Sequence, residues 1–283
     1  MLHRTQRVPA LMLATVVLAG CSDSGGLATE SGRSARAELS PTAQFDQRTL
    51  KDKGDVQIVA ASGDITAAVT QYRDLLGGGL PNPNVPGEQP GGRREINWDG
   101  VPAGFTNNDL FPGNFFNVNS PRGVVFTTDS VFRISSNGYT DVNPAYAGEF
   151  NFFSPIKLFA SRGSTVVDVQ FFVAGSTTPA TVVGFGSVFE DVGREYSTTI
   201  EYFDADGTRI LRLMVPRRSD EKGLSFAGAV FDSRIVARVR ITAGDTSIDP
   251  TVEDNVKGAG PKRDIVVMDD FIYGEPRASS SQR

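Results

Sequence analysis

Residues 235–241 read IVARVRI, and their apolar and charged side chains alternate with a period of two. Successive side chains of a β-strand point to opposite faces of its sheet. One face of this stretch is therefore apolar, and the other face carries Arg238 and Arg240. The pattern predicts an antiparallel strand that is buried on one side and solvated on the other.

Runs of similar composition recur on both sides of this stretch. Residues 204–207, DADG, separate two of them and predict a hairpin turn. Asp204 and Asp206 also resemble the start of a calcium loop, but its remaining ligands are missing, which favours a plain turn. Eleven short strands with turns between them predict an all-β fold, a jelly-roll-like antiparallel β-sandwich. Besides 235–243, the predicted strands are 123–128, 132–135, 150–153, 157–160, 165–173, 181–189, 198–203, 209–215, 224–231 and 265–273.

One amphipathic helix precedes the strands. Asp64 is its expected N-cap and Gly77 its expected end. Its apolar stripe is expected to pack on the protein's own sheet, with a partner-binding face as the alternative. The stripe comprises Ile65, Ala68, Val69, Tyr72, Leu75 and Leu76. Residues 56–94 are thus assigned to this helix and a Pro/Gly loop, residues 95–276 to the sandwich and residues 277–283 to a disordered tail.

The N-terminus has the features of an export signal. Arg4 and Arg7 precede an apolar run of about 12 residues, shorter than the roughly 20 residues that span a bilayer. Residues 18–21, LAGC, resemble the bacterial lipobox, which implies that residues 1–20 are a signal peptide and that Cys21 becomes the lipidated N-terminus. The protein is then expected in the cell envelope, held to a membrane by its lipid. Ser22 favours the outer membrane where one exists, and residues 21–55 are expected to be a flexible tether.

Composition excludes several kinds of chemistry. The 283 residues include one histidine, His3, and one cysteine, Cys21. Cleavage before Cys21 leaves no histidine, which excludes Ser-His-Asp and Cys-His catalysis, zinc sites, haem ligation and internal disulfides. The loss of two arginines changes the formal net charge from −5 to −7. Without a basic stripe or a Gly-rich phosphate loop, neither nucleic acid nor nucleotide is expected as a partner.

Five segments together resemble a known group of proteins. They are 93–101 (RREINWDGV), 115–123 (FFNVNSPRG), 184–192 (GFGSVFEDV), 200–207 (IEYFDADG) and 267–274 (VMDDFIYG). These segments resemble the core of secreted bacterial jelly-roll proteins, many of which carry a PEP-CTERM sorting tail. The resemblance spans about residues 58 to 276 and implies the fold and export, but no activity. No apolar sorting tail follows residue 276, and the lipobox is expected to replace that anchor.

Acidic side chains suggest a cation site. Asp269 and Asp270 are neighbours in the last predicted strand, so one of the two carboxylates points inward, and a buried carboxylate needs a partner, a proton or a metal. Similar acids in the final strand of jelly-roll carbohydrate-binding modules imply a structural Ca²⁺. Asp191 and Glu149 are the acids elsewhere that are expected to converge on it. The alternative is that Asp269 or Asp270 pairs with an arginine or caps loop amides.

Two long loops are further candidates. Residues 245–264 contain Asp245, Asp249, Glu253, Asp254 and Asp264, and this loop either binds cations or a basic partner or is disordered. Residues 101–122 mix phenylalanine and asparagine and lie next to Trp98. Trp98, Asn117 and Asn119 are the candidate contacts to a glycan, since sugars are held by aromatic stacking and amide hydrogen bonds. The alternative is a covering loop whose phenylalanines close the sandwich.

These features favour a module that is not an enzyme. The Glu-x-Asp-x-Glu strand of concanavalin-like hydrolases does not occur in the chain. We therefore expect a lipid-anchored extracytoplasmic binding or structural module for glycan or envelope polymer, stabilised by Ca²⁺. The alternative is a carbohydrate-active hydrolase or lyase that uses carboxylates, since such enzymes need two of them about 5 to 9.5 Å apart.

Overall fold

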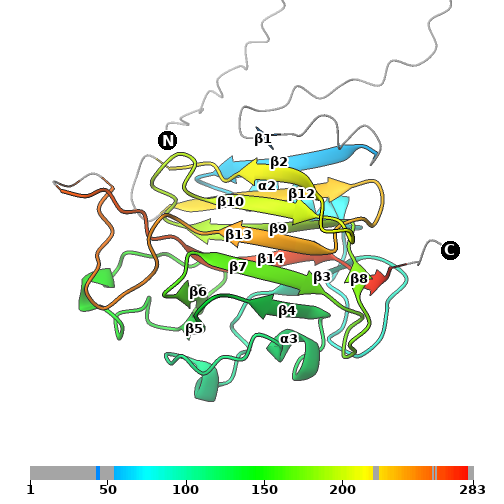
Figure 1. Ribbon diagram of the computed structural model, residues 1–283, viewed down its shortest axis with the longest axis horizontal. Coiled ribbons are helices and arrows are strands. Elements are labelled where there is room, and N and C mark those ends of the chain that lie inside the picture. The colour runs from blue at the N-terminus through cyan, green and yellow to red at the C-terminus, as the bar shows by residue number, and fades with distance from the viewer. Residues whose placement is uncertain (1–42, 45–53, 219–222, 257, 259, 280–283) are drawn as a thin grey trace, which may run out of the picture. The chain divides into compact units, whose positions relative to one another are not determined.

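Two antiparallel sheets enclose a phenylalanine-rich core (Figure 1). The computed structural model describes residues 43–44, 54–218, 223–256, 258 and 260–279. Cys21, the signal peptide and most of the tether lie outside the described residues. The prediction of an all-β sandwich is confirmed. In the part of the chain that the structure describes, no helix has the length and apolarity needed to cross a membrane.

The first sheet has six strands. In spatial order they are β1 (Ala43–Gln44), β11 (Arg209–Met214), β10 (Thr199–Phe203), β13 (Arg238–Thr242), β7 (Val166–Phe171) and β4 (Val124–Thr127). The stretch 238–242 alternates as its sequence predicts, because Val239 and Ile241 are buried in the core and Arg240 is exposed on the other face. Arg240 is in register with Glu201 of β10 on one side and with Asp168 of β7 on the other.

The second sheet has seven strands. A path of six runs β2 (Val56–Ser62), β12 (Leu224–Phe231), β9 (Gly184–Glu190), β14 (Val267–Gly274), β6 (Leu158–Arg162) and β5 (Val131–Ser135), and β3 (Arg93–Ile96) also pairs with β14. A small separate sheet joins β8 (Ala180–Thr181) to β15 (Arg277–Ala278). Every pairing between these strands is antiparallel.

Helix α2 (Thr66–Leu75) covers the outer face of the seven-stranded sheet. Tyr72 is fully buried there, and its hydroxyl donates to the Ala229 carbonyl at 3.1 Å. A Cβ at Gly228 would lie 2.7 Å from the Tyr72 ring, so the ring requires glycine in the strand beneath it. The helix thus packs on its own sheet, as predicted, and the Asp64 carboxylate accepts from the Thr66 N–H at the start of the helix.

Several segments differ from their predictions. Residues 56–62 form β2, whereas the sequence assigns them to the helical segment. Apolar side chains on one face of β2 contact the main core, and those on the other face pack with helix α2. The strand therefore lacks the alternation of apolar and polar residues. Residues 150–153 are not a strand, since Phe150 packs with Tyr139 and Tyr146 in a separate loop cluster. Arg277–Ala278 form β15 rather than belonging to a disordered tail. Short helices also occur at α3 (Phe115–Val118), η1 (Ala103–Phe105) and η2 (Pro144–Tyr146).

Candidate metal centre

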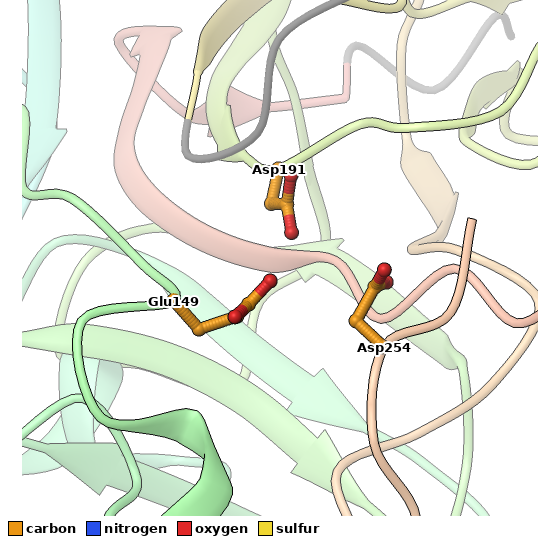
Figure 2. Close-up of side chains that lie close together, drawn as sticks. All are labelled: Glu149, Asp191 and Asp254. Carbon is orange, nitrogen blue, oxygen red and sulfur yellow. The ribbon is translucent and has the colours of Figure 1, made fainter. Parts of the chain in front are cut away.

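Three carboxylates from distant parts of the chain meet at one end of the sandwich. Glu149, Asp191 and Asp254 each offer an oxygen within 4.8 Å of the other two, and Figure 2 shows the three side chains pointing toward one another. We call these residues the triad. Asp191 is buried, and Glu149 and Asp254 are partly exposed. This arrangement provides oxygen ligands, which hard cations such as Ca²⁺ prefer.

The loop after η2 positions Glu149. The Glu149 N–H donates to the Tyr146 carbonyl at 3.0 Å, which closes a turn. Tyr146 in turn donates its hydroxyl to the Val252 carbonyl at 2.7 Å. This hydrogen bond ties the Glu149 loop to the loop that carries Asp254, so two segments about a hundred residues apart are held side by side.

Asp191 directly follows strand β9, which ends at Glu190. Its φ of 63° lies in the left-handed region, which aspartate tolerates better than most residues. The Asp191 N–H donates to the Gly223 carbonyl at 2.9 Å. The Asp191 side chain points toward Glu149 and Asp254 (Figure 2).

Asp254 lies in the loop between β13 and β14. Its two carboxylate oxygens accept from the Ile265 N–H at 2.8 Å and from the Val256 N–H at 3.3 Å. Burial raises the pKa of Asp254 to about 6, and the Asp264 and Glu149 carboxylates add to this rise against the two backbone donors. The carboxyl therefore carries an unfavourable charge at neutral pH, which a proton or a bound cation relieves.

Asp264 supports the same end of the sandwich without belonging to the triad. It is fully buried and accepts from the Gly193 N–H at 2.8 Å, the Arg194 N–H at 3.3 Å and the Ser197 hydroxyl. Burial raises the pKa of Asp264 despite these donors. These hydrogen bonds connect the loop after β9 to the residues just before β14.

Asp269, Asp270 and Glu190 form a second acidic cluster, which we call the buried acids. Asp269 is fully buried and accepts from the Phe153 N–H at 2.7 Å, the Ser154 N–H at 3.1 Å and the Ser154 hydroxyl at 2.7 Å. The pairing of β14 with β9 shifts register between Met268 and Phe271, and such a bulge redirects side chains. Burial and the Asp270 carboxylate raise the pKa of Asp269.

Asp270 faces a chain of alternating charges. One of its oxygens lies 3.4 Å from the Arg73 guanidinium of helix α2. Arg73 also pairs with Glu95 at 2.7 Å, and Glu95 pairs with Arg93 at 2.6 Å. Burial raises the pKa of Asp270, and the Arg73 charge opposes that rise.

Glu190, like Asp269, has no solvent-exposed surface. Its side chain is fully buried at the end of β9. A backbone donor at Asn151 favours the charged carboxylate, but burial outweighs it. Burial raises the pKa of Glu190 to about 10, and the Asp269 carboxylate adds to the rise. Glu190 therefore keeps its proton at neutral pH. Its place at the end of an otherwise apolar strand was the signal in the sequence.

The structure divides the four predicted metal ligands into two sites. Glu149 and Asp191 lie close to Asp254 of the 245–264 loop, whereas the sequence places them with Asp269 and Asp270. Asp269 and Asp270 do not lie in that group. Asp269 caps loop amides and Asp270 faces an arginine, which matches the alternative interpretation of both residues. The plain-turn interpretation of residues 204–207 also fits, because the Asp204 side chain accepts from Asp206 and Thr208 N–H groups.

The predicted glycan contacts are mostly internal, which corrects that expectation. Trp98 is 1% exposed, stacks on Phe159 with ring centroids 4.1 Å apart, and donates its indole N–H to the Asp269 carbonyl. Asn117 is buried and bonds to the backbone of Gly175 and Ser176. Only Asn119 of the three is exposed. Phe111, Phe115 and Phe116 of this segment are buried, so residues 101–122 act as a covering loop.

Comparisons with protein-family models, with curated proteins and with solved structures found no match. The fold and the triad describe the protein as an all-β sandwich with a candidate cation centre in the loops at the end of β9.

Proposed function

We propose that this chain is an extracytoplasmic, lipid-anchored β-sandwich that acts as a non-catalytic binding or structural module, with a Ca²⁺ ion holding its loops. The convergence of Glu149, Asp191 and Asp254 carries the proposal. Three carboxylates so close together repel one another unless a proton or a cation lies between them. Ca²⁺ takes six to eight oxygens, and three carboxylates with backbone carbonyls and water supply enough.

The proposed location supports the choice of cation. Extracellular calcium modules bind with dissociation constants of about 10⁻⁴ to 10⁻³ M, which suits a site exposed to an external calcium supply. A cation at the triad would link the loop after η2, the end of β9 and the β13–β14 loop. Its proposed role is therefore to stiffen loops, since all three carboxylates come from segments outside regular pairing or at its end.

The test is a thermal melt of the full chain in EDTA and in about 10 mM Ca²⁺. A ligand at a hundred times its dissociation constant stabilises by about 2.7 kcal/mol, which raises the midpoint by roughly 5 to 10 °C for a domain of this size. Asp254→Asn should abolish this rise. Glu253→Gln is the matched control, because Glu253 is an exposed acid next to Asp254 that lies outside the triad. No rise in the wild type, or equal loss in both variants, would refute the calcium site.

The anchor has its own test. Cys21→Ala should move the protein from the membrane fraction to the soluble fraction, because a lipidated cysteine is the proposed attachment. The control is Ser22→Ala, which leaves the cysteine in place. Unchanged fractionation of Cys21→Ala would refute the lipid anchor and leave the calcium proposal standing.

One observation favours the alternative of a carbohydrate-active hydrolase or lyase. Glu149 and Asp254 are partly exposed carboxylates whose oxygens lie within 4.8 Å, and retaining glycosidases place two carboxyl groups about 5 to 5.5 Å apart. Release of reducing sugar from polysaccharide, lost in Glu149→Gln and in Asp254→Asn, would establish the enzyme. Absence of turnover together with a calcium-dependent melt would establish the module.

A further inference from the structure

The outer face of the six-stranded sheet carries a regular pattern of charge. Strands β7, β13, β10 and β11 are neighbours in that order, and β10, β13 and β7 lie side by side in Figure 1. Acids occupy β7 and β10, and arginines occupy β13 and β11. We call this the arginine face, and it comprises Asp168, Glu201, Arg209, Arg212, Arg238 and Arg240.

Each acid lies between two arginines. Asp168 accepts from Arg238 at 2.5 Å and from Arg240 at 2.7 Å. Glu201 accepts from Arg209 and lies 3.9 Å from the Arg212 guanidinium. Although burial opposes it, hydrogen bonds from Arg240 and Arg238 lower the pKa of Asp168. Asp168 is therefore ionised at neutral pH. Asp168, Arg238 and Arg240 together carry a net charge of about +1.

The arginines extend farther into solvent than the acids. The side chains of Asp168 and Glu201 are 18% and 15% exposed, whereas those of the four arginines are 26% to 51% exposed. Arg238 also lies over the Phe203 ring, 3.8 Å from its centroid, which limits its motion. Asp129 also acts on Arg240. Among the described residues of the arginine face, four arginines stand against two acids.

The spacing of the charges restricts the partner. Neighbouring strands lie about 4.8 Å apart, so the arginines of β13 and β11 form two columns about 10 Å apart with the Glu201 carboxylate between them. A nucleic acid has one charge per about 1.7 Å of its axis and would bring phosphates onto that carboxylate. A chain whose negative charges are separated by neutral groups would place its charges on the arginines and its neutral groups over the acid.

We infer that the arginine face binds an acidic glycan whose carboxylates are separated by neutral sugars. This inference rests on the proposed role as a binding module and names the chemical class of its ligand. Guanidinium groups form charge-assisted, bidentate hydrogen bonds with carboxylates, and the four arginines retain donors beyond those used within the face. Their carboxylate neighbours hold them in place, which lowers the entropy lost on binding.

The probe is hyaluronan, which carries a carboxylate on every second sugar, in affinity electrophoresis of the full chain in nonionic detergent. The gels contain EDTA, so that a calcium ion at the triad plays no part. The protein should be retarded by hyaluronan and not by carboxyl-reduced hyaluronan, and added salt should weaken the retardation. Arg209→Gln/Arg212→Gln should weaken binding by roughly tenfold or more, since it removes charge-assisted hydrogen bonds.

The matched control is Arg217→Gln/Arg277→Gln. It removes the same charge from two arginines that also face glutamates, Glu195 at 3.4 Å and Glu88 at 3.7 Å, and that lie outside strands β7, β10, β11 and β13. This control should keep the wild-type affinity, and both double variants should keep the wild-type melting profile.

Three results would overturn the inference: no retardation by hyaluronan, equal weakening in both double variants, or tighter binding to a DNA duplex than to hyaluronan. Any of these results with an intact calcium-dependent melt would remove the glycan face and leave the calcium-stabilised module. Retardation by hyaluronan without a calcium effect on the melt would support the glycan face and refute the calcium site.

Discussion

Glu190 and Asp191 are neighbours in the chain, but their carboxyl groups belong to two differently built acidic clusters. Asp269 among the buried acids receives three hydrogen bonds, and Glu190 keeps a proton because burial raises its pKa to about 10. The triad instead gathers three carboxylates, two of them partly open to solvent. A cluster of acids therefore suggests a cation where three carboxylates share a space that ions can reach.

The largest expected effect is at Asp269. Asp269→Ala removes the acceptor of the Phe153 and Ser154 backbone N–H groups, which should lower the free energy of unfolding by about 3 kcal/mol. The loss should be the same in Ca²⁺ and in EDTA, measured by chemical denaturation. A loss confined to Ca²⁺ would place the cation at the buried acids and reverse the comparison.

Glu190 should contribute to the pH dependence of stability up to the highest pH of the buried acids. Its pKa rises from the usual 4.5 to about 10, so between these values the folded protein binds a proton that the unfolded chain releases. Stability should therefore fall as pH rises, by up to about 1.4 kcal/mol per pH unit. Glu190→Gln should lower the slope by about half between pH 6 and 7 in EDTA, because Asp269, whose pKa is raised to about 8, gives a slope of the same sign there. An unchanged slope would show that Glu190 is ionised in the folded state.

Glu149 should contribute to the stability of the fold only when calcium is present. Glu149→Gln should change the free energy of unfolding in EDTA by less than about 0.5 kcal/mol, because Glu149 is partly exposed. In Ca²⁺ it should lose most of the rise in melting midpoint, since one ligand is missing. Equal melting of this variant and the wild type in Ca²⁺ would remove Glu149 from the site.

The smallest effect is expected at the turn of residues 204–207. Asp206→Asn should change stability by less than about 0.5 kcal/mol and leave the calcium response intact. The turn is held by Asp204, whose side chain accepts from the Asp206 and Thr208 N–H groups. Loss of the calcium response in Asp206→Asn would move the cation from the triad to this hairpin.

Both the alternating strand β13 and the continuously buried strand β12 could be predicted from the sequence. Residues 224–231 form β12 as predicted, and β13 has the predicted buried and exposed sides. β2 was missed because apolar side chains on both of its faces contact other residues. Residues 150–153 were assigned to a strand on composition, but the Phe153 N–H donates to Asp269 instead of to a neighbouring strand.

The candidate site was half predictable. The sequence predicts that Glu149 and Asp191 converge on Asp269 and Asp270, but they lie with Asp254 instead, because that grouping depends on contacts distant in sequence. Tyr146 binds the loop that carries Asp254, and the register shift in β14 directs Asp269 toward Ser154. Trp98 was expected at a ligand surface, whereas the phenylalanines of residues 101–122 enclose it.

The sequence by itself determined the period of the strands, the helix that covers a sheet, and the residue types available for chemistry. These properties are local or compositional, so they can be read without knowing which segments meet. The tertiary structure alone decided which acids share a site, which keep a proton, and which arginines face outward together. Those properties depend on burial and on distances between residues far apart in the chain, because desolvation and charge interactions act through space rather than along the sequence.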